Sequence, residues 1–311
     1  MKFYPRYYYQ KPHCRWLANS RTLFLLRHKD DTDFTRIKYL DVGCGLRRLC
    51  LDCGKRYTQA KSSDAQNLFS AIINRYPETK VVHLVLTIPH NHPYHMKAGS
   101  ASFSQLLRSA NRFVKLHYPG AASLNVLHNW SSSNPEALHI HVHCLIVCLD
   151  KYGQPVDHYV NAEHLRESWR QLIFHPVLPV VHVEYFGLSD LAAIMHKLNY
   201  NLRSPIVDYC KNGDKPLSVA YCKTVSLLDG VHTIRWTGWL ANCCRHRNLA
   251  NLGIDVIIHN PLPEWRLFSI LQADWDYHSG KILLSNGDEI SPDDVFSIDQ
   301  ILRSKSYVIR R

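Results

Sequence analysis

The sequence lacks any run of eighteen apolar residues, the length that a helix needs to cross the hydrocarbon core of a membrane. Its first ten residues, MKFYPRYYYQ, lack the apolar stretch and the small-residue cleavage site of a secretory signal. No internal repeat and no long low-complexity segment occurs. We therefore expect a cytoplasmic protein with no membrane partner. With 311 residues, the chain suffices for one large domain or two smaller ones.

Acidic residues are in short supply. The chain has 26 Asp and Glu against 37 Lys and Arg, a formal charge of +11, and its 20 histidines can add positive charge beside phosphates. A polyanion is the partner expected of such a chain, and nucleic acid is the commonest polyanion. A basic surface without a specific role is the alternative that charge alone leaves open.

The ten cysteines predict a metal site more readily than disulfides, because the sequence shows no secretory signal. The first 60 residues have little hydrophobic periodicity, and a bound metal can replace a core. Cys44, Cys50 and Cys53 offer three thiolates for a tetrahedral zinc site, and Cys14 or His13 offers a fourth ligand. Four basic residues around these cysteines are predicted to contact phosphates: Arg47, Arg48, Lys55 and Arg56.

An apolar run over residues 138–149, LHIHVHCLIVCL, is interrupted by His139, His141 and His143. Side chains alternate between the faces of a β-strand, so the three imidazoles share one face, and the apolar run predicts a central strand buried on both sides. Alternate positions lie about 6.6 Å apart, which lets two rings converge on one cation. Hydrogen bonding to neighbouring strands is the alternative, but three histidines in phase favour a metal site.

The rest of the chain alternates between predicted strands and helices. Strands are expected at 81–88, 122–130, 138–149 and 180–186, and helices at 64–76, 102–117, 161–174 and 189–203. This order predicts an α+β fold, with a central antiparallel sheet and helices packed on one face in the ferredoxin-like manner. The predicted domains are a zinc-binding module (1–60), a domain built on this sheet (64–210) and a basic C-terminal extension (211–311), in which Asn286-Gly287 predicts a hairpin.

A tyrosine lies on the last of these helices with basic neighbours. Spacings of four and three residues place His196, Tyr200 and Arg203 on one helical face. A phenol with a pKa of about 10 is a poor nucleophile, yet beside a metal-bound phosphate it can attack phosphorus and form a covalent intermediate. Lys197 and Arg203 can then neutralise the phosphoryl charge. The alternative is an ordinary packed tyrosine, since the chain has 17.

Six stretches, in this order, resemble the HUH superfamily of single-strand DNA nicking and joining enzymes. The likeness is closest to rolling-circle insertion-sequence transposases with an N-terminal zinc-binding module, single-tyrosine relatives included, and spans roughly residues 44 to 250. The stretches are RLCLDCGK, VVHLVLTIPH, VLHNW, HIHVHCLIV, HKLNYNLRSPI and TIRWTGWLANCCRHRNLANL. The resemblance implies an RRM-like nuclease domain. It also assigns the last stretch to DNA binding, with Arg235, Arg245 and Arg247.

The resemblance also assigns the metal ligands. It makes His141 and His143 the paired ligands and places His139 at the histidine that often precedes them. His128, on a neighbouring strand, is the candidate third ligand, with Glu184 as its competitor. Mg²⁺ or Mn²⁺ is expected at the histidines and Zn²⁺ at the cysteines.

Tyr200 matches the second tyrosine of the family's two-tyrosine helix, and His196 occupies the first position. The implied reaction leaves a 5′-phosphotyrosine and a free 3′-hydroxyl on single-stranded or hairpin DNA, in transposition and DNA recombination or in rolling-circle replication of a plasmid or phage. Because one tyrosine can hold only one DNA end covalently, the reaction can require a second subunit, and a homodimer is then expected. The sequence lacks a GxxxxGK[ST] phosphate loop, so we expect a host helicase to separate the strands. A zinc-dependent DNA-binding protein without catalysis and a water-using hydrolase are the alternatives.

Overall fold

The computed structural model describes residues 46–245, except 158, 188, 189 and 214, and six strands outside that range. Side chains are described between residues 46 and 241. The chain divides into two compact units, residues 1–11 with 61–256 and residues 12–60 with 257–311. Among the described helices, none combines the length and the apolar character needed to span a membrane.

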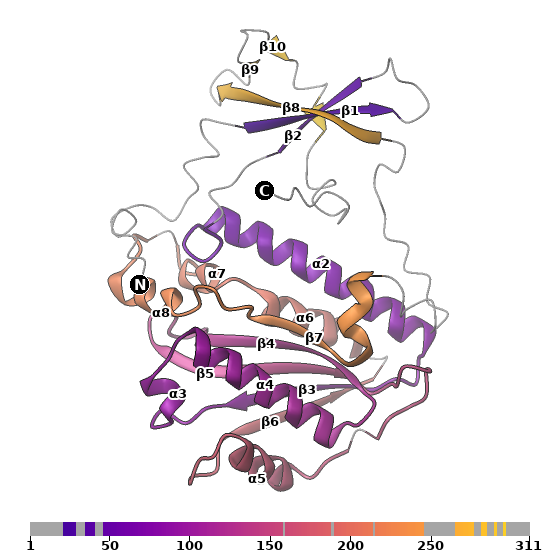
Figure 1. The fold of residues 1–311 in the computed structure, drawn as a ribbon, viewed down its shortest axis with the longest axis vertical. Helices are drawn as coiled ribbons and strands as arrows, with labels where there is room; N and C mark the ends of the chain where they lie inside the picture. The colour runs from indigo at the N-terminus through magenta and orange to yellow at the C-terminus, as the bar shows by residue number, and fades with distance from the viewer. Residues whose placement is uncertain are drawn as a thin grey trace. The chain divides into compact units, whose positions relative to one another are not determined.

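The smaller unit contains a six-stranded sheet with the order β10-β9-β8-β1-β2-β11. Its strands are β1 (Arg21–His28), β2 (Thr35–Leu40), β8 (Trp265–Asp276), β9 (Lys281–Leu284), β10 (Glu289–Ile290) and β11 (Val295–Phe296). Antiparallel pairing of β1 with β8 joins segments from the two ends of the sequence, a pairing that the sequence analysis did not anticipate (Figure 1). β9 and β10 pair antiparallel on either side of Asn286-Gly287, although these two residues lie outside the described part.

The larger unit is built on a five-stranded sheet in which every neighbouring pair is antiparallel. Its strands are β3 (Val81–Thr87), β4 (Ala122–Trp130), β5 (Leu138–Val147), β6 (Val181–Phe186) and β7 (Ile234–Thr237). The order β6-β3-β5-β4-β7 places the histidine strand β5 at the centre of the sheet. The α+β class, the antiparallel sheet and the four predicted strands are therefore confirmed.

The helices described in this part of the chain follow the predicted order. They are α2 (Leu51–Arg75), α3 (Pro93–Met96), α4 (Ser100–His117), α5 (Ala162–Leu172), α6 (Leu191–Leu202), α7 (Pro205–Tyr209), α8 (Val219–Ser226) and the 3₁₀ helix η3 (Gly238–Arg245). α2 begins well before the predicted residue 64, because its polar first half carries few apolar side chains that would show a helical period. The helix crosses the boundary between the two units, which lies at Lys61.

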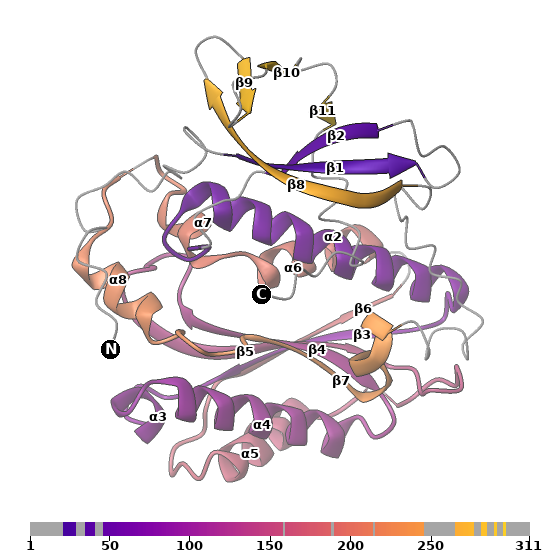
Figure 2. The ribbon, with the colours of Figure 1, turned by 45° about the horizontal axis from the view of Figure 1, so that its top comes forward.

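Helices cover both faces of the five-stranded sheet. On one face Ile140, Val142, Cys144 and Ile146 of β5 belong to a core with α4 and α5. On the other face Leu145 and Val147 pack with the second half of α2 and with α6 (Figure 2). The prediction of helices on one face alone is wrong. Burial of a large apolar side chain contributes roughly 1.5–3 kcal/mol, so a strand that is apolar on both faces requires a cover on each.

Candidate metal centre

Strand pairing brings three histidines together on the face of the sheet that α6 covers. His141 of β5 lies directly opposite His128 of β4, and His143 lies two residues further along the same face. Their side chains each offer a nitrogen, and these three nitrogens all lie within 4.8 Å of one another. Only 1% of His128, 6% of His141 and 4% of His143 is exposed, so they form a buried triad.

Hydrogen bonds to backbone carbonyls fix the ring hydrogen of two triad members. Nε2 of His128 donates to the carbonyl oxygen of Asn201 at 2.8 Å, and Nδ1 of His141 donates to that of His139 at 3.1 Å. Since a neutral imidazole carries one hydrogen, the lone pairs remain on Nδ1 of His128 and Nε2 of His141. Nδ1 of His128 is buried and has no hydrogen-bond partner.

The third member, His143, is oriented by a chain of side chains that ends at a carboxylate. Nδ1 of His83 donates to Oε2 of Glu184 at 3.0 Å, which leaves Nε2 of His83 to accept from Nδ1 of His143 at 3.1 Å. Nε2 of His143 therefore carries a lone pair, and it too is buried without a partner. Such outer hydrogen bonds are the usual means of fixing the tautomer of a metal-binding histidine.

Glu184 is held as an anion by its neighbours. Lys197 donates to Oε2 of Glu184 at 2.7 Å, and His182 lies 3.3 Å from Oε1. Burial opposes ionisation, but hydrogen bonds from Lys197, His83 and His182 outweigh it and lower the pKa of Glu184 to about 2. The carboxylate is thus an acceptor for His83 at all ordinary pH values.

The triad is neutral, as metal-binding imidazoles must be. Burial is the main cause that lowers the pKa of His128 and His143 well below the ordinary value and that of His141 to about 3. The neighbouring Arg203 guanidinium lowers all three further. Protons therefore do not compete with a cation for these lone pairs near neutral pH.

The ring separations fit a single shared ion. The centroids of His128 and His143 lie 4.7 Å apart, those of His141 and His143 4.8 Å, and those of His128 and His141 5.3 Å. Imidazoles that bind one ion through nitrogens at ~2.1 Å have ring centroids ~5 Å apart. Together with the two unpartnered buried nitrogens, these separations support the triad as a metal site.

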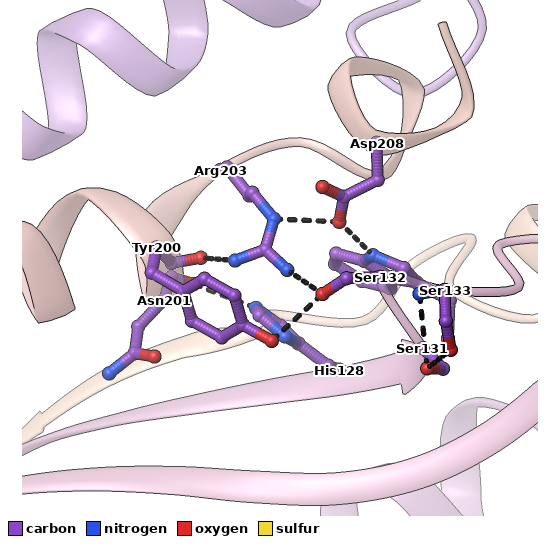
Figure 3. Close-up of polar contacts among 9 residues, drawn as sticks. His128, Ser131, Ser132, Ser133, Tyr200, Asn201, Arg203 and Asp208 are labelled. Carbon is purple, nitrogen blue, oxygen red and sulfur yellow. Dashed lines mark hydrogen bonds and ion pairs between the residues drawn. The ribbon is translucent and has the colours of Figure 1, made fainter. Parts of the chain in front are cut away.

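Tyr200 of α6 lies beside the triad, and 36% of it is exposed. Its ring meets that of His143 edge-on, with centroids 5.7 Å apart. Its hydroxyl Oη lies 2.8 Å from Oγ of Ser132 (Figure 3). The buried triad and this accessible phenol therefore share one site.

Arg203 contacts Tyr200 and two of the residues around it, Ser132 and Asp208. Its guanidinium lies over the Tyr200 ring, 3.5 Å from the centroid, and donates to Oγ of Ser132 at 2.7 Å and to the carbonyl oxygen of Tyr200. It also donates to Oδ2 of Asp208 at 2.6 Å, and the same oxygen accepts from Nε1 of Trp130 at 2.8 Å (Figure 3). The predicted phosphate-neutralising groups Arg203 and Lys197 are thus both paired with carboxylates.

Other predicted site residues are not members of the triad. The ring of His139 lies 4.9 Å from that of His141 but is not part of the buried triad, and Glu184 contacts His83 instead. His196 is exposed on α6. Cys50 precedes α2 and Cys53 lies in its first turn, where the Cys53 amide donates to Sγ of Cys50 at 3.5 Å. Cys14, His13 and Cys44 lie outside the described residues.

The predicted DNA-contacting residues are dispersed along the chain. Arg47 lies 4.2 Å over the ring of Tyr57 just before α2, and Lys55 and Arg56 are on that helix, Lys55 being exposed. Arg48 precedes α2 as well, and Arg235 is on the edge strand β7. Arg245 ends η3, with its side chain undescribed, and Arg247 lies outside the described residues.

His83, Ser132 and Asp208 also belong to this site but were not predicted from the sequence. His83 had a signal, because it is a single histidine in the apolar strand VVHLVLT. Antiparallel pairing places His83 opposite Leu145 and Glu184, and so diagonal to His143.

Comparison of the chain with protein-family models, with curated proteins and with solved structures finds no significant match in any of the three.

Proposed function

We propose that the protein nicks and rejoins single-stranded DNA in a divalent-metal-dependent reaction, with Tyr200 as the nucleophile. The observation that carries the proposal is the accessible phenol of Tyr200 beside three buried imidazoles, two of which have a buried ring nitrogen without a hydrogen-bond partner. Most buried side-chain nitrogens in proteins have a hydrogen-bond partner, so two unpartnered nitrogens that face one cluster favour a bound ligand. The formal charge of +11 and the resemblance to HUH enzymes favour DNA as the substrate.

The reaction exchanges one phosphate ester for another. Oη of Tyr200 forms a bond to phosphorus while the bond from phosphorus to the 3′ oxygen breaks. The phenol loses its proton and the departing 3′ oxygen gains one, which gives a 5′-phosphotyrosine and a free 3′-hydroxyl. Attack by a 3′-hydroxyl on the phosphotyrosine reverses these bond changes and joins the strands.

The chain's own residues position the phenol. Arg203 stacks on its ring, and Ser132 lies within hydrogen-bonding distance of Oη, where it can relay the departing proton. His128, His141 and His143 would hold a divalent ion, which when bound would supply electrophilic stabilisation of the phosphate. Three neutral imidazoles without a carboxylate favour Mn²⁺ over Mg²⁺ among the ions expected there.

A single tyrosine limits what one subunit can do. His196, one turn before Tyr200, is exposed, so this helix offers one phenol to the site. A reaction that holds two DNA ends covalently therefore requires a second subunit, whereas one nick followed by one joining step does not. Transposition and the initiation of plasmid or phage replication use the same chemistry, and we favour transposition because the resemblance is closest there.

The test is incubation of labelled single-stranded DNA with Mn²⁺ and protein, followed by denaturing electrophoresis. We expect a band of protein-linked DNA with the wild type and with Tyr152→Phe, an exposed tyrosine in the turn after β5. The band should be absent with Tyr200→Phe although DNA binding persists. Cleavage by Tyr200→Phe would instead indicate a water-using hydrolase, and binding without any cleavage by the wild type would indicate a non-catalytic DNA-binding protein.

A further inference from the structure

A second group of histidines lies at the same end of the sheet as the triad. His90 follows β3, His95 is in α3, and His139 is at the start of β5. The ring of His90 lies 4.9 Å from that of His95 and 6.0 Å from that of His139. The loop after β3, the short helix α3 and the start of β5 thus bring three imidazoles together.

The histidines of this region differ in whether their ring nitrogens have hydrogen-bond partners. His92 uses both ring nitrogens, since Nε2 donates to the carbonyl oxygen of Ile173 at 2.7 Å and Nδ1 accepts from the amide of Tyr94 at 3.0 Å. His92 is therefore a structural residue with no lone pair left for a ligand. The protein itself supplies a hydrogen-bond partner for each ring nitrogen of His92.

His95 is different from His92. One nitrogen of the His95 ring forms a hydrogen bond with the backbone of Ile88, while the other, Nε2, is buried and has no partner. The donor must be Nδ1, because a carbonyl oxygen only accepts, so the lone pair is on Nε2. An unpaired buried nitrogen is unfavourable unless a ligand satisfies it. Within the described part of the chain, no hydrogen bond is made by the rings of His90 or His139.

We propose that His90, His95 and His139 form a second cation site, distinct from the triad, for a transition metal such as Zn²⁺, Ni²⁺ or Cu²⁺. Imidazole ligands without a carboxylate select these ions over Mg²⁺ and Ca²⁺. The separation of 4.9 Å between His90 and His95 already matches two ligands of one ion. His90 is exposed, so its ring can turn toward His139 at little cost.

The two cation sites are neighbours along β5. His139 is two residues before His141 on the same face of the strand, and their ring centroids lie 4.9 Å apart. An ion at the second site adds positive charge next to the triad, although its binding does not depend on DNA cleavage.

The test counts bound metal in variants of the full-length protein that lack the triad. Protein with His128→Ala and His143→Ala is stripped of metal and titrated with NiCl₂ by calorimetry. Adding His95→Ala to it should remove one equivalent of Ni²⁺ binding, whereas adding His164→Ala, an exposed histidine on α5, should remove none. Cysteine sites are present in every variant, so they cancel in the comparison.

A second variant guards against misfolding. His90→Ala changes an exposed side chain and should weaken the same binding event by about tenfold or more, as expected for loss of a ligand. Identical Ni²⁺ titrations with and without His95→Ala would overturn the proposal. The proposal would also be overturned if His164→Ala removed an equivalent of Ni²⁺ binding, as His95→Ala is expected to do. The experiment measures metal stoichiometry and not DNA cleavage. The second cation site can therefore be disproved without affecting the proposed DNA chemistry, and the DNA chemistry can be disproved without affecting the second cation site.

Discussion

Nε2 of His83 lies 3.1 Å from Nδ1 of His143, so a histidine outside the triad fixes the hydrogen position of one inside it. Without His83, the ring hydrogen of His143 can move to Nε2, the atom that faces the other triad nitrogens. His83 is therefore a positioning residue for metal binding rather than a ligand.

His83→Leu should weaken Mn²⁺ binding at the triad by about 10- to 100-fold, the usual cost of losing an outer hydrogen bond to a ligand. Titration followed by the electron paramagnetic resonance signal of unbound Mn²⁺ measures this affinity. His164→Leu, which replaces an exposed histidine on α5, should bind Mn²⁺ like the wild type. An unaltered affinity in His83→Leu would show that the hydrogen bond to His143 is dispensable.

Metal-free protein should lose stability as the pH falls below about 6.5. Burial lowers the pKa of His83 to about 4 and that of His141 to about 3, so the unfolded chain binds protons that the folded chain does not. The free energy of unfolding therefore falls from pH 6.5 down through pH 4 to 3, by several kcal/mol in all. Urea unfolding at a series of pH values measures it, and His141→Gln should flatten the slope. A slope equal to that of the wild type would contradict this origin.

Arg203→Ala should destabilise the protein by about 3–5 kcal/mol, because it leaves the carboxylate of Asp208 buried without its cation. Only 9% of each side chain is exposed. Urea unfolding measures the loss, and the additional change Asp208→Asn should recover part of it. Arg166→Ala, at an exposed position of α5, should cost little. A loss no larger than that of Arg166→Ala would mean that the ion pair contributes nothing.

Cys50→Ser or Cys53→Ser should release the zinc that the sequence predicts near the start of the chain. Thiolates bind Zn²⁺ far better than hydroxyls do, and loss of one of four ligands opens the site. Elemental analysis of the purified variants measures the zinc content, with Cys222→Ser of α8 as the control. Wild-type protein that contains no zinc would dismiss the site.

The sequence predicted the parts of this site that lie on one element. Alternation of His139, His141 and His143 with apolar residues is a local pattern, and it identified β5 as a central strand with a histidine face. The placement of Tyr200 near the end of α6, with Arg203 directly after the helix, is equally local. Helix and strand positions followed from periodicity for the same reason.

What the sequence could not supply was the choice of partners across elements. Nothing in the local pattern says that His83 lies diagonal to His143, because this depends on the register of β3 against β5. The pairing of Arg203 with Asp208 rather than with a ligand is likewise set by the turn from α6 into α7. Covers on both faces of the sheet could have been predicted from β5 alone, because the histidine face continues with Leu145 and Val147 and the other face is wholly apolar.

The pairing of β1 with β8 has a consequence for synthesis on the ribosome. β1 (Arg21–His28) emerges early, but the strand that it pairs with, β8 (Trp265–Asp276), emerges only after most of the chain has been made. At roughly 5–20 residues per second, this delay lasts about ten seconds or more. One edge of β1 is thus exposed on the nascent chain while the larger unit, whose strands are all made before β8, can already fold. The smaller unit, although residues 12–60 belong to it, is the last to be completed.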